Sequence, residues 1–401
     1  MPSTMEGTGA DDGEHVSQAE PLTLGSEARQ RPALLDLAFE LGRDAAALRA
    51  SLPATLAVPM AGVVRSMNCY YSNLIEGHDT HPLDIERALR RDFSDDPEQR
   101  DLQLEAAAHI EVQRWIDAGH LDGRALSVDG LRDVHRRFCE RLPAELLRTT
   151  SPDGSTRIPV VPGAWRETYV RVGRHVPVSP GAVPRFMRRF EGAFRGQGPT
   201  ETLLAAASSH HRLLWIHPFA DGNGRVARLM SHAVLRETLG TAGLWSVARG
   251  LARHVDEYKR RLGAADLPRR NDLDGRGHLG EEALADFTDF FLRTAIDQVS
   301  FMTALVRPRE LRGRIVRWAA DEIGRGALPI GADRVVRESL DGEVARSEVP
   351  AIVDRGDRQA RRVTAALVKT GVIESSGPKG ALRLSLPAGL APRLLPGLFP
   401  D

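Results

Sequence analysis

The sequence predicts a mainly α-helical protein: a helical bundle with one β-hairpin flap, followed by a smaller C-terminal module. Three observations predict this fold. Apolar residues recur at helical spacing over most of the chain, one β-branched and aromatic run interrupts them, and a Gly-Pro turn with alternating apolar residues closes the C-terminal part. With 401 residues and 42% hydrophobic content, the chain is long enough for two or three packed domains.

Charge and cysteine content exclude several classes of protein. The 54 Lys and Arg residues balance 54 Asp and Glu residues, which argues against a polybasic protein that binds nucleic acid through bulk charge but leaves room for a local basic face. Cys69 and Cys139 are far apart and lack metal-ligand spacing, as suits a reducing cytoplasm. No apolar run approaches the roughly 18 residues of a membrane span, and no export signal precedes the helices. We therefore expect a cytoplasmic protein without a membrane partner.

The N-terminal part is predicted to be a tail followed by helices. Residues 1–30 are rich in Gly, Ser, Glu and Asp and carry almost no large apolar side chains, so we expect a disordered tail. Residues 31–118 are predicted to be a helical N-terminal region. Its apolar residues fall on stripes at helical spacing, as in Leu34, Leu37, Leu41 and Leu48.

The central part, residues 119–298, continues the helical spacing and is predicted to be the domain that carries the functional site. Residues 158–177 interrupt the pattern with a run that contains Tyr169, Val170 and Val172 between proline-marked turns. Such a run is typical of paired strands, so these residues predict the hairpin flap.

The C-terminal module, residues 308–386, is predicted to be a winged helix-turn-helix domain. Three or four short helices precede a Gly-Pro turn at residues 377–380, and an alternating strand pattern follows that turn. Residues 387–401 are rich in Pro and Leu without periodicity and are predicted to be a loosely packed tail.

The third helix of this module, over residues 358–372, is basic. Such a helix can enter a DNA major groove and contact phosphates, but a solvated charged face gives the same pattern, so both readings stay open. If the module does not bind DNA, we expect it to bind protein. The basic residues of this helix are Arg358, Arg361, Arg362 and Lys369.

The most informative stretch is IHPFADGNGRVAR, residues 216–228, between two apolar helices. A proline ends the incoming helix, and two glycines around an asparagine let backbone N–H groups turn inward at the start of the next helix, the geometry that holds a phosphate. His217 can act as a general base, and Asp221 is suited to Mg²⁺. Arg225 and Arg228, three residues apart, can hold further phosphates. Together they predict nucleotidyl or phosphoryl transfer.

Each element of this stretch alone also fits an ordinary helix cap and an Asn-Gly turn. The full set at this spacing should arise by chance well under about once in a billion starts, given average residue usage. The stretch resembles the signature HPFx[DE]GNGRxxR of Fic domains, and every fixed position is present.

The resemblance implies a Fic fold of six to eight helices and a protein adenylyltransferase that uses ATP as substrate and Mg²⁺ as cofactor. AMP would pass from ATP to a Ser, Thr or Tyr hydroxyl of a target protein, with His217 deprotonating that hydroxyl. Asp221 would hold Mg²⁺ on the α- and β-phosphates. Arg225 would contact the β-phosphate or the far side of the anion hole, and Arg228 the γ-phosphate. Gly224 favours AMP transfer, because a phosphorylating branch of the family has Lys there.

Other parts of the chain extend the resemblance. The runs 162–166 and 170–175 are similar to the family's flap, whose exposed strand edge would pair with an extended segment of the target. Tyr258 resembles the family aromatic that lies by the adenine, although Lys259 replaces the second Tyr. His211 also matches the family, but its apolar helix favours a buried structural role.

The resemblance thus implies a nucleotide-binding set. The backbone of residues 222–224 and the side-chain amide of Asn223 would form the anion hole. The full set comprises Gly222, Asn223, Gly224, Arg225, Val226, Ala227 and Arg228 in the signature, Val172, Gly173, Arg174 and His175 in the flap, and Tyr258 and Glu76 elsewhere.

An inhibitory motif is suggested by residues 72–77, SNLIEG, which resemble the family pattern [ST]xxxE[GN]. The resemblance implies that Glu76 pairs with Arg228 in place of the γ-phosphate, while Ser72 holds the motif in position. An ordinary helix end with Gly77 as its C-cap is the alternative.

Two other functions stay open. In one, the chain is a nucleotide-sensing winged-helix transcriptional regulator; in the other, Glu76 positions water to remove AMP from a modified target. The expected partners are a target protein at the flap, DNA at the C-terminal module and a second copy of the chain in a homodimer.

Overall fold

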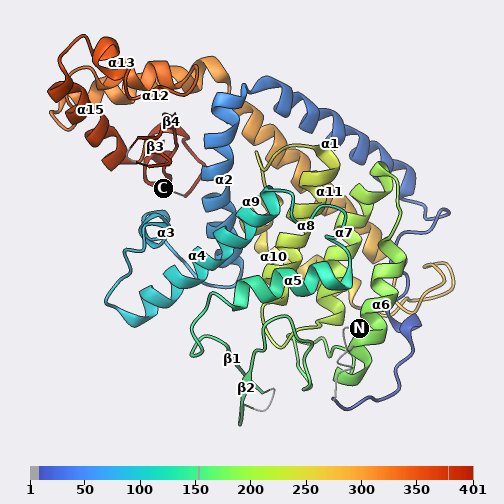
Figure 1. Ribbon diagram of the computed structural model, residues 1–401. Helices are drawn as coiled ribbons and strands as arrows, with labels where there is room; N and C mark the ends of the chain where they lie inside the picture. Colours follow the sequence, from blue (N-terminus) through green and yellow to red (C-terminus); the bar gives the residue numbers. More distant parts are fainter. Residues whose placement is uncertain (1–8, 152–153, 378, 401) are drawn as a thin grey trace.

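The computed structural model describes residues 9–151, 154–377 and 379–400. A helical body occupies most of it, and a smaller C-terminal lobe lies at one end (Figure 1). The first five helices of the body are α1 (Arg31–Ser51), α2 (Ala54–Ile75), α3 (Pro82–Leu89), α4 (Pro97–Asp117) and α5 (Val128–Cys139). The remaining helices of the body are α6 (Val183–Phe194), α7 (Pro199–Ile216), α8 (Asn223–Leu239), α9 (Val247–Arg253), α10 (Val255–Ala265) and α11 (Glu281–Leu305). The mainly α-helical fold class is confirmed.

The helices α7 and α8 pack along each other through the middle of the body. Helix α7 also contacts α1, α6 and α11, while α8 contacts α4 and α5. Because α7 is enclosed by these neighbours, even its polar residues Ser209, His210 and His211 are fully buried. The loop that joins the two helices is therefore held at both ends by the core.

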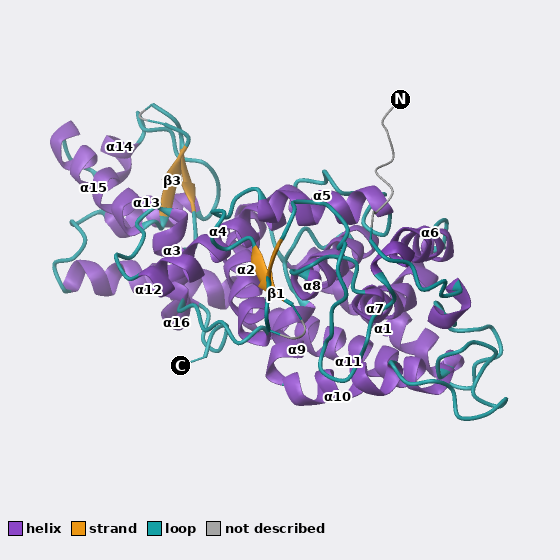
Figure 2. Cartoon of the chain, turned by 90° about the horizontal axis from the view of Figure 1, so that it is seen from below, coloured by secondary structure: helices purple, strands orange, loops and turns teal. Residues whose placement is uncertain are grey.

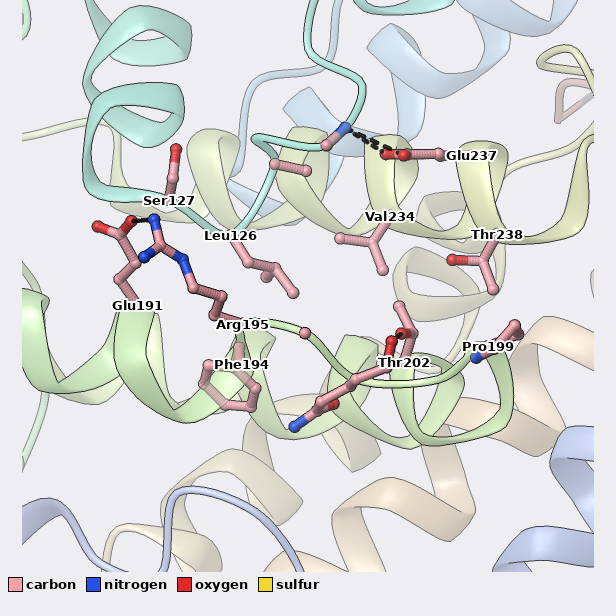
Figure 3. A pocket seen from close by; sticks show the side chains of 14 residues that line it. Leu126, Ser127, Glu191, Phe194, Arg195, Pro199, Thr202, Val234, Glu237 and Thr238 are labelled. Atoms are coloured by element: carbon pink, nitrogen blue, oxygen red, sulfur yellow. Dashed lines mark hydrogen bonds and ion pairs between the residues drawn. The ribbon is translucent and has the colours of Figure 1, made fainter.

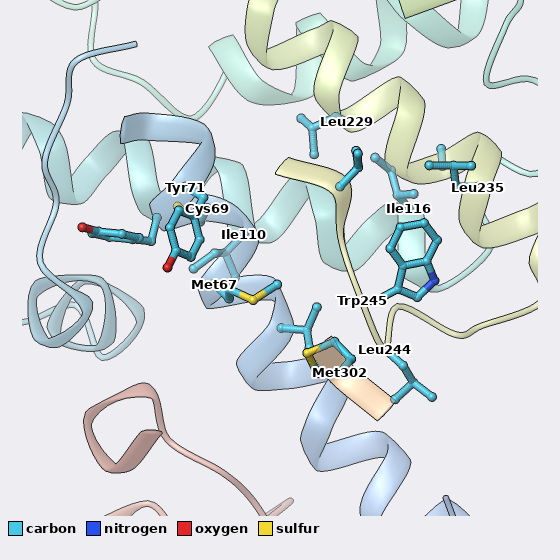
Figure 4. Packing of buried hydrophobic residues seen from close by; sticks show 14 of the residues in the cluster. Met67, Cys69, Tyr71, Ile110, Ile116, Leu229, Leu235, Leu244, Trp245 and Met302 are labelled. Carbon is cyan, nitrogen blue, oxygen red and sulfur yellow. The ribbon is translucent and has the colours of Figure 1, made fainter. Parts of the chain in front are cut away.

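Helix α2 is a second core element. Its Met67 and Cys69 belong to the same buried cluster as Ile110 of α4, Leu229 of α8 and Met302 of α11 (Figure 4). Both its C-terminal end and the loop after α7 reach the same region, so core packing fixes the position of residues 72–76 relative to the signature.

The C-terminal lobe contains three short helices and a two-stranded hairpin, in the order predicted. In the described part of the hairpin, Glu374 lies opposite Arg383, and Pro378 at the tip lies outside the described residues. Figure 2 shows this lobe at the end of the molecule away from α6. Its assignment as a winged helix stays a prediction. The lobe and the tail after it contain α12 (Pro308–Gly324), α13 (Ala332–Ser339), α14 (Val349–Val353), α15 (Asp357–Thr370), β3 (Ile373–Ser375), β4 (Leu382–Leu384) and α16 (Ala391–Leu394).

The hairpin flap differs from the prediction over residues 158–177. The paired strands are β1 (Arg148–Thr150) and β2 (Arg157–Pro159), with Thr149 opposite Ile158. After β2 the chain is a loop, and a single bridge joins Val172 to His175. Prolines at three positions between residues 159 and 177 remove ladder donors, which explains why the run does not form two regular strands.

The disordered tail predicted over residues 1–30 is wrong for residues 9–30, while residues 1–8 lie outside the described part. The segment contains a 3-10 helix (Val16–Ala19), and Leu22 is 2% exposed. Its acidic residues form ion pairs with α6, including Asp11 and Glu14 with Arg185. The acidic residues that suggested disorder therefore form ion pairs with basic residues about 170 positions away.

The loosely packed tail predicted over residues 387–401 is also wrong for residues 387–400, the described part. A 3-10 helix (Ala388–Leu390) precedes α16, and Leu395 and Leu398 are buried. The ring of Phe399 meets Tyr70 of α2 edge-on, with centroids 5.8 Å apart. The closing segment thus joins the C-terminal lobe to α2.

Within the described residues, no single helix combines the length and the apolar composition that crossing a membrane requires.

Candidate active site

His217 is the residue at which α7 ends. It adopts a left-handed conformation (φ 51°, ψ 61°), its N–H donates to the Leu213 carbonyl, and the next residue is a proline that cannot continue the helix. Its Nδ1 lies 3.3 Å from the Leu214 carbonyl oxygen, so Nδ1 carries the proton and Nε2 is left as an acceptor. Burial lowers the pKa of His217 to about 4. The imidazole is therefore neutral at pH 7, as a general base must be.

The side chain of Asn223 holds the signature loop in shape. Its Oδ1 accepts from the Phe219 N–H (3.0 Å), and its Nδ2 donates to the Phe219 carbonyl (2.9 Å). Each end of this amide makes one hydrogen bond within the loop, and the second N–H of Nδ2 is not used there, so the expectation that the amide lines the anion hole stays a prediction. Helix α8 begins at Asn223, after Gly222 in a left-handed conformation (φ 80°) and without a side-chain cap. Its first backbone N–H groups are left for an anion.

Asp221 is exposed at the mouth of this loop. No described residue donates a hydrogen bond to its carboxylate, whereas its backbone carbonyl accepts from His135 Nε2 at 3.2 Å. No cluster of three or more metal-ligating side chains exists among the described residues. A single free carboxylate beside a phosphate site fits Mg²⁺, which keeps several waters and shares its remaining positions with substrate phosphates.

Arg228 is 2% exposed and binds the end of α2. Its Nε donates to Ser72 Oγ at 2.8 Å, and its Nη2 to Glu76 Oε1 at 2.5 Å. The predicted pairing of Glu76 with Arg228 is thus observed. Burial works to raise the pKa of the Glu76 carboxyl, but the charge and hydrogen bond of Arg228 outweigh it and hold this pKa below its usual value.

Gly224 provides the space that Glu76 occupies. A Cβ built on this glycine would lie 2.3 Å from Glu76 Oε1 and 3.1 Å from Arg228 Nη1. The carboxylate therefore rests on the bare Cα of the signature loop, directly over the start of α8. Gly77 follows in a left-handed conformation (φ 87°) and ends α2, so the helix-end reading and the pairing describe the same residues.

Arg225 lies away from this pair, on the α4 side of the loop. Its Nη2 donates to Glu105 of α4 at 2.7 Å and lies 3.2 Å from Nδ1 of His78. Its guanidinium is also 5.2 Å from the centroid of the Phe138 ring. In this arrangement Arg225 anchors α8 to α4, and its predicted contact with the β-phosphate stays a prediction.

Tyr258 does not offer a face to adenine. The side chain is 2% exposed, its hydroxyl lies 2.7 Å from His210 Nε2, and its ring packs against Phe287. Burial raises the pKa of this hydroxyl. The expectation that the Tyr258 ring lies by the adenine is wrong for this structure, because the ring is enclosed by His210 of α7 and Phe287 of α11. His211 is fully buried, as expected, and pairs with Asp266 at 3.1 Å.

The remaining predicted nucleotide-binding residues lie in two places. Val226 and Ala227 are buried in α8, so only their backbone can reach a ligand. In the flap, Val172, Gly173 and Arg174 are exposed, whereas His175 Nε2 lies 2.7 Å from the Trp215 carbonyl oxygen at the end of α7. Their contacts with a nucleotide stay predictions.

Sequence reasoning assigned no role to His135, which supports the loop from α5. Its ring stacks on Phe219 with centroids 3.9 Å apart, and the Gly163 N–H donates to its Nδ1 at 2.9 Å. Burial lowers the pKa of His135 to about 4, so it is neutral and donates from Nε2 to the Asp221 carbonyl. Only its position on the amphipathic helix 128–139 was visible in the sequence.

A cavity of about 460 Å³ lies at the opposite ends of α7 and α8. Figure 3 shows Leu126, Glu191, Arg195 and Glu237 around it, where α8 finishes and α7 begins. None of the predicted site residues lines it. The chemistry-bearing groups therefore gather at the His217 end of the helix pair and not at this cavity.

Comparison with known proteins identifies the family that the central part of the chain matches. Residues 125–235 match the Fic/DOC family model. This part of the chain is a Fic domain. The segment includes His217, Asp221 and Arg228 but begins after α2, so the helix that carries Glu76 lies outside it.

Two curated relatives are named protein adenylyltransferase Fic. The protein of Nematostella vectensis is 28% identical over 192 residues, which cover 46% of this chain and 41% of that protein. The protein of Culex quinquefasciatus is 28% identical over 169 residues, which cover 41% of this chain and 31% of that protein. The similarity thus spans less than half the length of the curated relatives.

Solved Fic structures share the fold. A Fic family protein from Desulfovibrio desulfuricans G20 superposes with a TM-score of 0.51 at 18% identity, covering 88% of this chain and 96% of that one. Fic-1 (residues 134–508) from C. elegans gives a TM-score of 0.50 at 18% identity, covering 70% and 74%. At these identities the likeness concerns the fold alone.

Proposed function

We propose that the chain is a protein adenylyltransferase that transfers AMP from ATP to a Ser, Thr or Tyr hydroxyl of a target protein. The observation that carries the proposal is a neutral His217 imidazole fixed beside the uncapped start of α8, with Arg228 five residues after the first residue of that helix. The name shared by the curated relatives of its Fic domain supports the same activity.

The reaction follows from these groups. Nε2 of His217 takes the proton of the target hydroxyl, and the hydroxyl oxygen forms a bond to the α-phosphorus of ATP. The bond from that phosphorus to the bridging oxygen breaks, and pyrophosphate leaves with its electron pair. Backbone N–H groups at the start of α8 stabilise the charge that develops on the phosphate oxygens.

Asp221 is proposed to hold Mg²⁺, because its carboxylate is exposed and free of other donors among the described residues. The cation would neutralise negative charge on the phosphates. Asp221→Ala should weaken Mg²⁺-dependent ATP binding and lower the rate together. Unchanged dependence on Mg²⁺ would remove Asp221 from this role.

Glu76 is proposed to inhibit the site. With Glu76 on Arg228 and over Gly224, the γ-phosphate of ATP cannot reach the guanidinium. ATP would then bind in a shifted pose, and a displacement of about 1 Å can lower the rate on the order of a hundredfold.

The experiment that tests the activity uses ATP labelled on the α-phosphate, Mg²⁺ and the Glu76→Gly variant with a cellular lysate. We expect covalent label on protein, and its loss in Glu76→Gly/His217→Ala by about 10²- to 10⁴-fold with ATP affinity nearly intact. ATP binding without any label would instead identify a nucleotide sensor. Retained labelling after His217→Ala would reject the mechanism.

A second partner, DNA, is proposed for the C-terminal lobe. A groove of about 830 Å³ between α14 and α15 is lined by Arg346, Arg361 and Lys369, with Asp357 as its acidic member. In the described part of the chain none of these three cations is ion-paired with a carboxylate, so they remain available to phosphates.

Duplex DNA of random sequence, labelled for fluorescence anisotropy, tests this partner. We expect binding that weakens with salt and drops when Arg361 and Arg362 become Ala, but persists in Arg325→Ala, whose guanidinium pairs with Glu322 instead. Absence of binding at low salt would assign the lobe to protein interaction. A cytoplasmic location, consistent with two free buried cysteines, and a homodimer remain part of the proposal.

A further inference from the structure

Arg166 lies at the base of the flap and has no place in the reaction described above. It is 2% exposed. Its Nε donates to the His217 carbonyl at 2.8 Å, its Nη1 to the Thr168 carbonyl at 3.1 Å, and its Nη2 to the Val178 carbonyl. Its backbone N–H donates to the Pro218 carbonyl at 2.9 Å. One residue thus connects Thr168 and Val178, on either side of the Val172–His175 bridge, to the residue proposed as the base.

The partners of this guanidinium are carbonyl oxygens, and no carboxylate of the described residues forms an ion pair with it. Two of them, Ile216 and His217, belong to the C-terminal end of α7, where the helix dipole and unpaired carbonyls favour a cation. Burial lowers the pKa of Arg166 to about 10, so the group keeps its charge at neutral pH. Its planar fork reaches several carbonyls at once, which the single ammonium of Lys cannot do.

Two consequences for His217 follow from this placement. Its left-handed backbone, uncommon for a non-glycine residue, is fixed by the hydrogen bond from Arg166. The positive charge also acts on the imidazole. The charged or titratable groups that face this imidazole are Arg166 and His175 from the flap and Glu76 from α2. Burial is the main cause that lowers the pKa of His217; the hydrogen bond with the Leu214 carbonyl opposes it, the charge of Arg166 favours the neutral form, and Glu76 favours the protonated form.

We propose that Arg166 is a positioning residue that holds the flap at a fixed distance from His217 and keeps a positive charge beside its imidazole. The proposal rests on the proposed adenylyltransferase activity, since the flap is the surface on which a target segment would be held. Geometry and charge are separate parts of the role, and two kinds of substitution separate them. Arg166→Lys keeps the charge and loses the fork, whereas Arg166→Gln and Arg166→Met lose both.

The first measurement is an NMR titration of the His217 ring in the full chain, assigned by comparison with His217→Ala. We expect the titration of His217 to move up by roughly 0.5 to 1 pH unit in Arg166→Gln and Arg166→Met, because a cation that disfavours protonation has been removed, and to stay in place in Arg166→Lys. If Arg166→Gln or Arg166→Met is folded and the titration of His217 does not move, the proposal that the charge of Arg166 acts on this imidazole is overturned. This readout needs no enzymatic activity, so it stands even if AMP transfer is not found.

The second measurement compares transfer with ATP binding in the Glu76→Gly background. We expect Arg166→Lys to lower kcat for AMP transfer by about ten- to a hundredfold with an unchanged Kd for ATP, because only the alignment of hydroxyl and base is disturbed. If Arg166→Lys has the same kcat as its Glu76→Gly parent, or loses ATP binding in parallel with kcat, the proposal that Arg166 positions the flap relative to His217 is overturned. If Glu76→Gly itself transfers no AMP, the proposed function fails instead.

Arg132 offers a matched control for both measurements. It lies under the same part of the flap, where its Nε donates to the Gly163 carbonyl at 2.7 Å and its guanidinium stacks on Trp165, but no hydrogen bond joins it to His217. Arg132→Lys and Arg132→Gln should leave both the titration of His217 and kcat close to those of the parent. An equal effect of the Arg132 and Arg166 variants would show that any change near the flap suffices, and would overturn the assignment to Arg166.

Discussion

Two carboxylate–arginine pairs, each with an arginine of α8, look alike but occupy different surroundings. Glu76 at the end of α2 binds Arg228, and Glu105 in the middle of α4 binds Arg225. The Glu76 side chain is 36% exposed and is followed by a glycine, whereas that of Glu105 is 13% exposed and has His78 as a second partner. The comparison teaches that the Glu105 pair belongs to the fold, while the Glu76 pair can open without disturbing the core.

The largest expected effect is on stability. Glu105→Ala leaves the guanidinium of Arg225 buried without its carboxylate, so it should lower the free energy of unfolding by about 3 kcal/mol. Glu76→Gly should lower it by less, about 1 kcal/mol, because the Glu76 side chain is 36% exposed and the hydroxyl of Ser72 still accepts a hydrogen bond from Arg228. Urea unfolding of both variants measures the difference.

The control for this prediction is Glu111→Ala on the same helix. Glu111 pairs with Arg141 but is half exposed, so its removal should change the free energy of unfolding by under about 1 kcal/mol. If Glu105→Ala is as mild as Glu111→Ala, the distinction between the two pairs is lost.

The next effect is on activity. Glu76→Gly frees Arg228 for the γ-phosphate and should raise AMP transfer on the order of a hundredfold, equivalent to about 2.7 kcal/mol in the barrier. Labelling of protein by ATP carrying ³²P on its α-phosphate measures it. The double variant Glu76→Gly/Arg228→Ala should be weak again. A double variant as active as Glu76→Gly alone, or no increase in Glu76→Gly, would contradict inhibition by this pair.

The smallest effect concerns pH. The hydrogen bond from Glu105 raises the pKa of His78 against the effect of burial. The stability that protonated His78 contributes is fully present below its unfolded value near 6.5 and is lost as pH rises through the higher folded value. In the parent, the free energy of unfolding should therefore fall by about a few tenths of a kcal/mol as the pH rises above 6.5, and His78→Gln should abolish this fall. Denaturant midpoints at pH 6 and pH 8 measure it, and an unchanged difference between them would show that His78 does not titrate with this pair.

Local features of the site were predictable from the sequence, and distant ones were not. The loop from Pro218 to Gly224 is set by its own residues, because proline ends one helix and glycines permit the turn into the next. The anchor of Arg225 is a glutamate 120 positions away, and nothing in a local pattern distinguishes Glu105 from its neighbours on α4. Tyr258 was misplaced for the same reason, since its enclosure depends on α7 and on Phe287.

The fold shows the same division. Helical spacing predicted the body, because periodicity reports which face of a segment is buried. Hydrophobic periodicity is weak in residues 9–30 and in the segment after residue 387. These segments are ordered by contacts with residues far away in the sequence, such as Arg185 and Tyr70. The flap lacks its predicted ladder for two reasons: prolines remove backbone donors, and the Arg166 side chain takes the carbonyls of Thr168 and Val178. The residue types reveal the first cause but not the second.

Helix α2 contacts both the helical body and the C-terminal segment of the chain. One end of it presents Glu76 to the Fic domain, and Tyr70, less than two turns earlier, takes the ring of Phe399 from the closing segment of the chain. Thermodynamic linkage makes the effects of two ligands on a shared helix reciprocal. If a ligand of the C-terminal lobe shifts the packing on α2 and thereby changes the affinity for ATP, then ATP changes the affinity for that ligand by the same factor. Amide hydrogen exchange along residues 66–76 would therefore register occupancy at either lobe, which makes one helix a reporter for both.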